Sequence, residues 1–352
     1  MNIRAALLTA HNAPLTLATL EPLPLTYGQV LVRILASGIC GAQLQELDGH
    51  KKTGPMPHPL GHEGVGIVEE VGPAVRQVKV GDKVVMHWRK GDGIESEFPR
   101  YLLPPSLPLD ATWADVNPSN QGAIITGGKV TTFSDFSVCS ENRLTPVPPE
   151  TPVELCALLG CSLSTALGVI ENEANLKMGE SVLIIGCGGL GLNLILAARM
   201  RMAGSIIGMD IKHEKLHAVL AFGARFEVTG LCPHKETFDV VIDTTGDPEA
   251  MDSGLSRLAP SGRFIMVGQP RPGVSVPVNN ARHLFSGEGC SIKATQGGCF
   301  QPSRDIPRYI RAYEAGHLKV DGIVTHRMGL DFVNDAIALV RNGEAGRVLL
   351  IP

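Results

Sequence analysis

A glycine-rich hexapeptide constrains the fold of this chain more than any other feature. Gly186-Cys187-Gly188-Gly189-Leu190-Gly191 follows the apolar run 181–185 and precedes a helix-like run over 192–200. Strand, glycine turn and helix in this order predict a dinucleotide-binding unit. The glycines let the backbone approach a pyrophosphate, and the helix N-terminus offers it unpaired N–H groups. We therefore predict that Gly186, Gly188, Gly189, Leu190 and Gly191 bind the cofactor.

An acidic residue follows at the spacing that such a unit requires. A second apolar run, 205–209, ends in Asp210, which is placed to accept hydrogen bonds from the ribose hydroxyls of a dinucleotide. A carboxylate there would repel the 2′-phosphate of NADP. Asp210 therefore predicts NAD as the cofactor.

The pattern of apolar runs predicts two kinds of domain in one chain. From 181 to about 295 the sequence alternates between strand-like and helical runs, which predicts a doubly wound parallel sheet of the Rossmann type. The predicted strands of this sheet are 182–186, 205–209, 238–243 and 263–267. Residues 1 to about 88 instead form short alternating runs bounded by glycine or proline, which is typical of a β-rich domain. The predicted fold class is therefore α/β with a second, β-rich domain.

Two further stretches complete this outline. Residues 89–128 are dominated by Pro, Ser, Gly and Asn, and a loop of this length is usually functional. The tail predicts helices near 304–315 and 331–342 and a last strand over 347–351.

Charge and hydropathy exclude several classes of function. The net charge of -4 gives no electrostatic basis for binding nucleic acid or an anionic membrane. No apolar run reaches the roughly 18 residues of a membrane span, and the N-terminus lacks the pattern of a signal peptide. We expect a cytoplasmic protein that acts on a small molecule. The eight cysteines are scattered, which suits metal ligands or buried thiols better than a disulfide framework.

Three candidate metal ligands lie far apart along the chain. Cys40 lies in Gly38-Ile39-Cys40-Gly41, His62 in Gly61-His62-Glu63-Gly64, and Cys161 in Gly160-Cys161-Ser162. No local C-x-x-C spacing indicates a metal, and a lone cysteine in an apolar stretch is usually a small buried hydrophobe. The residues alone leave both interpretations open.

Taken in order, these segments resemble the zinc-dependent medium-chain dehydrogenase/reductase family, the alcohol and polyol dehydrogenases, over essentially the whole chain. The resemblance implies a GroES-like catalytic domain over 1–155 and 296–352 and a Rossmann NAD-binding domain over 156–295. It implies that Cys40, His62 and Cys161 hold one catalytic zinc per chain, leaving a fourth position for water or substrate. Glu63 would be a carboxylate able to approach that zinc; the alternative is a buried carboxylate held by a nearby Arg or by backbone donors.

The resemblance also implies further contacts with the cofactor. Thr165 would lie near the nicotinamide, Val267 near its carboxamide, Arg347 near the pyrophosphate, and Lys215 against the adenosine ribose. Because relatives form dimers and tetramers, we expect a homo-oligomer.

The chain departs from the family pattern in three ways. Ala42 stands where the family commonly has a hydroxyl that relays the substrate proton, and Gln43 where it commonly has an Asp that supports the zinc-binding histidine. Residues 86–130 contain no cysteine, so the family's structural zinc lobe is absent. We predict His87 as a substitute proton relay, with His50 in reserve. The resemblance places His87 and Trp88 in the lining of the substrate pocket, where Arg89 and Lys90 would hold an anionic or polyhydroxylated substrate and favour sugars or polyols. The alternative is that Trp88 belongs to the core and that Arg89 and Lys90 are exposed loop charges.

These observations predict a zinc-dependent enzyme that transfers a hydride between an alcohol, polyol or sugar-type hydroxyl and NAD. Two alternatives stay open. A zinc-free enone or quinone reductase of the same superfamily would not need Cys40, His62 and Cys161, and metal analysis separates it. A non-catalytic dinucleotide-binding protein would explain Ala42 and Gln43, and a substrate screen separates that.

Overall fold

The computed structural model describes residues 1–103, 122–228 and 236–352, which form two compact units. Unit 1 comprises Met1–Cys161, Gln301–Ile310 and Val324–Pro352, and unit 2 comprises Ser162–Phe300 and Arg311–Ile323. The boundaries predicted after residues 155 and 295 lie several residues before these divisions, and residues 311–323, which were predicted in the catalytic domain, belong to unit 2. Residues up to 161 stay with unit 1 because the preceding helix packs on its strands.

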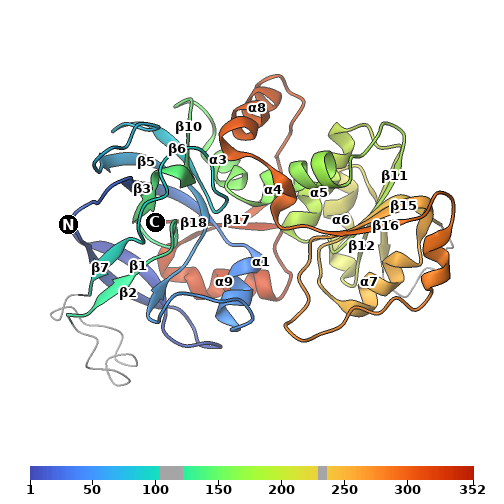
Figure 1. Ribbon diagram of the computed structural model, residues 1–352, viewed down its shortest axis with the longest axis horizontal. Helices are drawn as coiled ribbons and strands as arrows, with labels where there is room; N and C mark the ends of the chain where they lie inside the picture. The colour runs from blue at the N-terminus through green and yellow to red at the C-terminus, as the bar shows by residue number, and fades with distance from the viewer. Residues whose placement is uncertain (104–121, 229–235) are drawn as a thin grey trace. The chain divides into compact units, whose positions relative to one another are not determined.

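Unit 1 is built on two sheets (Figure 1). The five-stranded sheet has the order β4-β1-β2-β7-β8, and the seven-stranded sheet has the order β10-β6-β5-β3-β18-β17, with β9 also paired to β3. Its strands are β1 Ile3–Leu8, β2 Thr16–Pro22, β3 Gln29–Gly38, β4 His58–Pro59, β5 Glu63–Val71, β6 Lys83–His87, β7 Arg100–Leu102, β8 Ile124–Thr126, β9 Phe136–Ser140, β10 Leu144–Val147, β17 Val324–Gly329 and β18 Arg347–Ile351.

Short helices connect these strands. They are α1 Gly41–Leu47, η2 Glu141–Arg143, α3 Val153–Leu159, η7 Leu330–Phe332, α9 Val333–Arg341 and the first turns of α8 Pro302–Glu314. The predicted helices of the tail and the last strand are all present. The strands β7 and β8 form within the segment predicted as loop, because Arg100 pairs with Thr126 and Leu102 with Ile124. The remainder of that segment, 104–121, lies outside the described residues.

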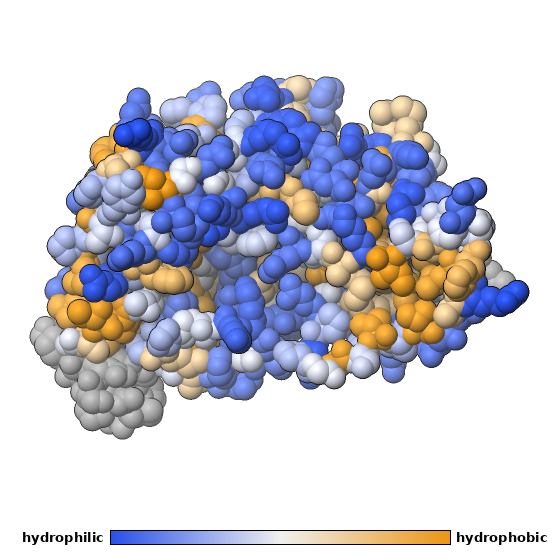
Figure 2. Space-filling model, in the orientation of Figure 1, coloured by the Kyte–Doolittle hydropathy of each residue, from blue (hydrophilic) through white to orange (hydrophobic). Residues whose placement is uncertain are grey.

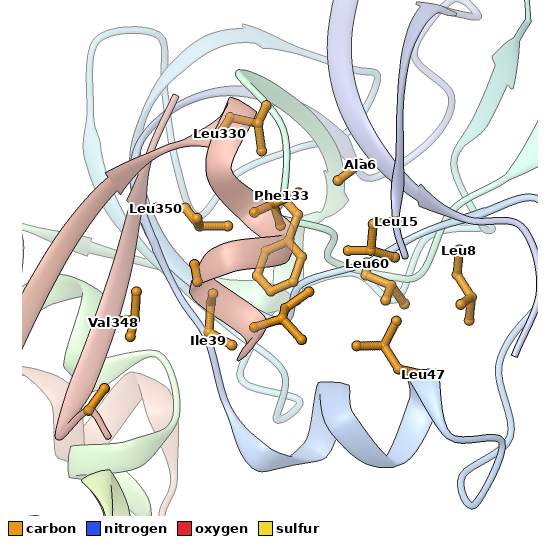
Figure 3. Packing of buried hydrophobic residues seen from close by; sticks show 14 residues of the cluster. Ala6, Leu8, Leu15, Ile39, Leu47, Leu60, Phe133, Leu330, Val348 and Leu350 are labelled. Atoms are coloured by element: carbon orange, nitrogen blue, oxygen red, sulfur yellow. The ribbon is translucent and has the colours of Figure 1, made fainter. Parts of the chain in front are cut away.

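One apolar cluster of unit 1 supports the segments that carry the candidate ligands. Ile39, which precedes Cys40, and Leu60, two residues before His62, are both at most 3% exposed and belong to this cluster. Figure 3 shows Phe133 at its centre, between Ile39 and Leu350 on one side and Leu60 on the other. Burying each such side chain contributes about 1.5–3 kcal/mol, so the ligand segments are attached to a rigid core.

Unit 2 carries the predicted doubly wound sheet. Its six strands have the order β13-β12-β11-β14-β15-β16, and every pairing is parallel. The strands are β11 Ser181–Ile185, β12 Ser205–Asp210, β13 Arg225–Val228, β14 Phe238–Asp243, β15 Leu258–Met266 and β16 Ser291–Ala294. The helices are α4 Ser162–Gly168, η3 Val169–Glu173, α5 Gly189–Met200, η4 His213–Lys215, α6 Leu216–Ala221, α7 Pro248–Leu255, η5 Ala281–Phe285 and η6 Gly297–Cys299.

Burial explains which of these strands the sequence revealed. The central strands β11 and β14 are almost entirely buried, so they are continuous apolar runs. The end strands β13 and β16 were not predicted, because each is only four residues long and its half-buried or exposed residues form no continuous apolar run.

No single helix among the described residues is long and apolar enough to cross a membrane; one bent pair, Val153–Leu159 with Ser162–Glu173, passes by length and composition alone.

Candidate metal and cofactor sites

Four side chains from distant segments of unit 1 converge on one point. The donor atoms of Cys40, His62, Glu63 and Cys161 all lie within 4.8 Å of one another. Cys40 lies between β3 and α1 and is the N-cap residue of α1. His62 immediately precedes β5, which begins at Glu63, and Cys161 lies just after α3. Two thiols, an imidazole and a carboxylate form a donor set that suits zinc. Within the described residues, this is the one cluster of three or more metal-ligating side chains.

The glycines beside these ligands are required by close packing. A Cβ on Gly38 would lie 2.8 Å from Cδ of Glu63, and a Cβ on Gly160 would lie 2.4 Å from the carbonyl oxygen of Met86. Gly61 has φ +93, a conformation that L side chains rarely adopt. The glycines that accompany Cys40, His62 and Cys161 in the sequence therefore let three chain segments approach each other.

One member of the cluster, Glu63, also forms a buried ion pair. Glu63 and Arg347 are 0% and 4% exposed, and the Arg347 guanidinium contacts the Glu63 carboxylate. The other carboxylate oxygen, Oε2, is buried without a hydrogen-bond partner among the described residues, which leaves it available to a cation. Burial lowers the pKa of Arg347, and the neighbouring Cys40 partly offsets that effect. The predicted contact of Arg347 with the pyrophosphate stays a prediction.

The surroundings of Cys40 favour the charged form that binds metals. A hydrogen bond with Cys161 holds the pKa of the Cys40 thiol well below its ordinary value, against the effect of burial, and His62 and Arg347 act in the same direction. A thiolate is the form of cysteine that ligates zinc. The residues present thus fit the metal that the resemblance implies.

Gln43 occupies the place next to His62 that the family commonly gives to Asp. The side chain is fully buried on α1, its Oε1 accepts the backbone N–H of Cys40 at 3.1 Å, and its Nε2 contacts Nδ1 of His62. The sequence marked Gln43 as a departure but did not reveal the bond to Cys40. A capping pattern, in which the third helical residue reaches back to the cap, was the available signal.

The structure corrects the relay role predicted for His87. The ring is fully buried on β6, with Nδ1 2.7 Å from the carbonyl oxygen of Arg89 and Nε2 2.9 Å from the hydroxyl of Thr145. The carbonyl can only accept, so Nδ1 donates, and Nε2 accepts from the hydroxyl. Desolvation by burial lowers the pKa of His87 to about 4. Both nitrogens are engaged, so His87 anchors β6 to its neighbours and has no nitrogen left for a substrate proton.

The residues after His87 interact within their own segment. The Arg89 guanidinium lies 5.9 Å from the ring centroid of Trp88, and the Lys90 ammonium lies 3.9 Å from a carboxylate oxygen of Glu95. The reserve relay, His50, lies just beyond α1 and is partly exposed. Its role stays a prediction.

The glycine turn of unit 2 has the geometry of a phosphate-binding loop. Gly186 has φ +89, and a Cβ on Gly191 would lie 2.0 Å from the carbonyl oxygen of Gly186, so both positions require glycine. A Cβ on Gly188 would meet nothing within 4 Å, which leaves this backbone open to a ligand. Gly189 and Leu190 form the first turn of α5, whose N–H groups point toward that open side.

Asp210 is held rigidly beside this turn. Its Oδ2 accepts the N–H of Cys187 at 2.7 Å, and its Oδ1 accepts the N–H of Lys212 at 2.9 Å. Lys215 is 8% exposed; burial lowers its pKa, and the attraction of Asp210 opposes that shift. Two backbone bonds therefore fix the carboxylate at the carboxyl end of β12, where a doubly wound sheet binds its ligand.

Two further predicted contacts also lie in unit 2. Val267 follows β15 and lines a hollow together with Gly268 and Thr295. Thr165 lies on α4 at 5% exposure, and its hydroxyl has no hydrogen-bond partner among the described residues. Their contacts with a nicotinamide remain predictions.

Comparisons with known proteins agree with this geometry. Residues 26–149 match the family model for the alcohol dehydrogenase GroES-like domain, and residues 189–315 match that for zinc-binding dehydrogenase. Alcohol dehydrogenase 6 of Peromyscus maniculatus is 29% identical over 370 residues, covering 99% of this chain and 97% of that protein. An S-(hydroxymethyl)glutathione dehydrogenase of Escherichia coli is 28% identical over 376 residues, covering 99% of this chain and all of its own.

A solved structure shares the fold over the whole chain. Benzyl alcohol dehydrogenase from Acinetobacter calcoaceticus superposes with a TM-score of 0.84 at 24% identity, covering 100% of this chain and 99% of its own. The predicted combination of a GroES-like and a Rossmann domain is thereby confirmed. Zinc and a nicotinamide dinucleotide are the cofactors of such an enzyme, and the zinc-free alternative is set aside. This chain belongs to the zinc-dependent medium-chain dehydrogenase/reductase family and is an oxidoreductase of the alcohol dehydrogenase type.

Proposed function

We propose that the protein catalyses the reversible oxidation of a hydroxyl group with NAD. The convergence of Cys40, His62 and Cys161, with donor atoms within 4.8 Å, carries the proposal. These three residues would hold one zinc per chain, and Glu63 would lie behind it. Zinc supplies Lewis acidity toward a substrate oxygen, and NAD supplies the oxidising power. The chain's own part is to fix these ligands and to bind the dinucleotide.

Asp210 supports the choice of NAD over NADP. Both of its oxygens already accept backbone N–H groups, so the carboxylate cannot turn away from a ribose. Holding a 2′-phosphate beside it would disfavour NADP by roughly 2 kcal/mol, about 30-fold in catalytic efficiency. Asp210→Ser should reduce that preference at least tenfold. Equal efficiency of the wild-type protein with NADP would show that Lys212 or Lys215 outweighs Asp210.

The substrate that we propose is an alcohol, with polyol and sugar hydroxyls in its range. The support is the polar segment after β6, where the Lys90 side chain is 64% exposed and lies near Glu95. Alternating charges of this kind hydrogen-bond hydroxyl groups. A screen of aliphatic alcohols, benzylic alcohols, polyols and aldoses with NAD tests the proposal. Turnover with none of them would refute it, and turnover confined to the apolar alcohols would remove polyols and sugars.

We also propose that two copies associate through unit 2. Strand β16 ends the six-stranded sheet, and all four of its residues are exposed. Apolar side chains gather on the face of unit 2 near β15, β16 and α7 (Figure 2). Among the exposed large hydrophobic residues of this part of the chain are Phe285 at 82% and Ile292 at 42%. An exposed edge strand with apolar neighbours suits pairing with the same strand of a second copy.

Sedimentation analysis tests this interface. We expect a dimer or a larger even-numbered assembly, and Ile292→Lys together with Phe285→Glu should give a monomer that still binds dinucleotide. A wild-type monomer at micromolar concentration would contradict the proposal.

A further inference from the structure

One neutral side chain connects two of the proposed zinc ligands. Gln43 is fully buried, its Oε1 accepts the backbone N–H of Cys40 at 3.1 Å, and its amide nitrogen contacts Nδ1 of His62. The ring nitrogen left to face Cys40 and Cys161 is therefore Nε2. The amide contacts both ligand segments, and its orientation decides whether Nδ1 of His62 faces a hydrogen-bond donor or an acceptor.

The bond to Cys40 fixes which way the amide is turned. A backbone N–H can only donate, so the amide atom that faces it must be the oxygen. The –NH2 group is then directed at His62, and because it too can only donate, it requires a lone pair on Nδ1. A neutral imidazole whose Nδ1 accepts carries its proton on Nε2. Nε2 is the nitrogen that has to bind the metal.

A carboxylate in this place would act in the opposite way. It would accept from Nδ1–H, leave the lone pair of Nε2 free for a metal, and make the imidazole a stronger donor. With Gln43, the tautomer that binds metal is gained only if the amide turns over and gives up its bond to Cys40. The side chain thus works against the metal-binding tautomer of His62 while it holds Cys40 in position.

We propose that Gln43 is a positioning residue that lowers the zinc affinity of this site and couples metal loading to the orientation of its own amide. The proposal rests on the proposed occupancy of Cys40, His62 and Cys161 by zinc. It goes beyond that function because it predicts that this chain exchanges its zinc more readily than a site with a carboxylate in this position.

Gln43→Glu is the sharpest test, since it keeps length and shape. One carboxylate oxygen can accept the Cys40 N–H and the other can accept Nδ1–H of His62. Loss of such a partner typically costs 10–100-fold in metal affinity, so its gain should tighten zinc binding by about 10–100-fold. Competition between the full-length protein and a chromophoric chelator measures the dissociation constant. Gln43→Met removes both the bond that opposes the metal-binding tautomer and the bond that holds Cys40, so it should not reproduce the gain of Gln43→Glu.

Gln45→Glu is the matched control, because it adds the same charge two residues further along α1. We expect it to change zinc affinity by less than about twofold. Gln43→Glu without a gain, or Gln45→Glu with an equal gain, would overturn the proposal while leaving the proposed function intact. Failure of the wild-type protein to bind zinc at all would overturn both.

A second measurement needs no variant. Nitrogen-15 spectra of histidine-labelled, zinc-free protein report which ring nitrogen of His62 carries the proton. We expect the proton on Nε2 in the wild-type chain. A proton on Nδ1 would show that the amide is turned the other way and would overturn the proposal.

Discussion

The ion pair between Glu63 and Arg347 offers a quantitative test of how the metal site is supported. The Glu63 side chain is 0% exposed and the Arg347 side chain is 5% exposed, so neither can turn to water when its partner is removed. Replacing one partner of a buried pair typically costs about 3–5 kcal/mol, because the remaining charge is left without compensation. Glu63→Met and Arg347→Met should each destabilise unit 1 by this amount. The double variant leaves no buried charge, and its apolar side chains of similar length should recover most of that loss.

Tryptophan fluorescence can follow this unit by itself. Trp88 is the one tryptophan among the described residues, and it lies in unit 1. For a unit of this size, 1 kcal/mol shifts the melting temperature by about 2–4 °C, so each single variant should melt about 6–20 °C lower than wild type. The melts are recorded with zinc in excess, so that loss of metal does not contribute.

Two results would refute the argument. Single variants that melt within about 2 °C of wild type would show that water or another group compensates the remaining charge. A double variant that loses the sum of both single effects would show that the two side chains act independently. Dinucleotide affinity separates a second role, since only Arg347→Met should weaken it if the predicted pyrophosphate contact exists.

His87, Cys161 and His50 can each be tested separately. The pKa of His87 is about 4 in the folded protein against about 6.5 in the unfolded chain, so the unfolded state takes up a proton first as pH falls. The contribution of His87 to the free energy of unfolding should therefore be fully present above pH 6.5 and fall by about 3 kcal/mol down to pH 4. Thermal melts of His87→Gln should lack this decline. An unchanged dependence on pH would contradict the burial argument. Cys161→Ser should abolish turnover and bound zinc by elemental analysis with the fold retained, whereas Cys156→Ser, a buried thiol of α3 outside the cluster, should keep its zinc. His50→Ala should depress turnover about 100-fold and alter the acid limb of the pH profile if His50 relays the proton; unaltered kinetics would place that role on bound water or the cofactor ribose.

The dinucleotide-binding unit was predictable from the amino-acid sequence alone, because its signals are local. An apolar run before Gly186 and a helical run after Gly191 need only neighbours in the chain to be recognised. The central strands were equally readable, since burial on both faces makes them continuously apolar. The edge strand β16 was missed because it is exposed and only four residues long, too short for its alternation of polar and apolar residues to stand out from a loop.

The surroundings of the proposed metal, by contrast, depend on tertiary packing and could not be predicted from the sequence. His87 is next to a ligand segment in the sheet and was a reasonable relay from its position alone, but contacts with Thr145 and Arg89 engage both of its nitrogens. The pairing of Glu63 with Arg347 joins positions almost three hundred residues apart, which no spacing rule predicts. The role of Gln43 depends on which amide atom faces Cys40. Such contacts are set by the packing of several segments at once, and the sequence shows each segment alone.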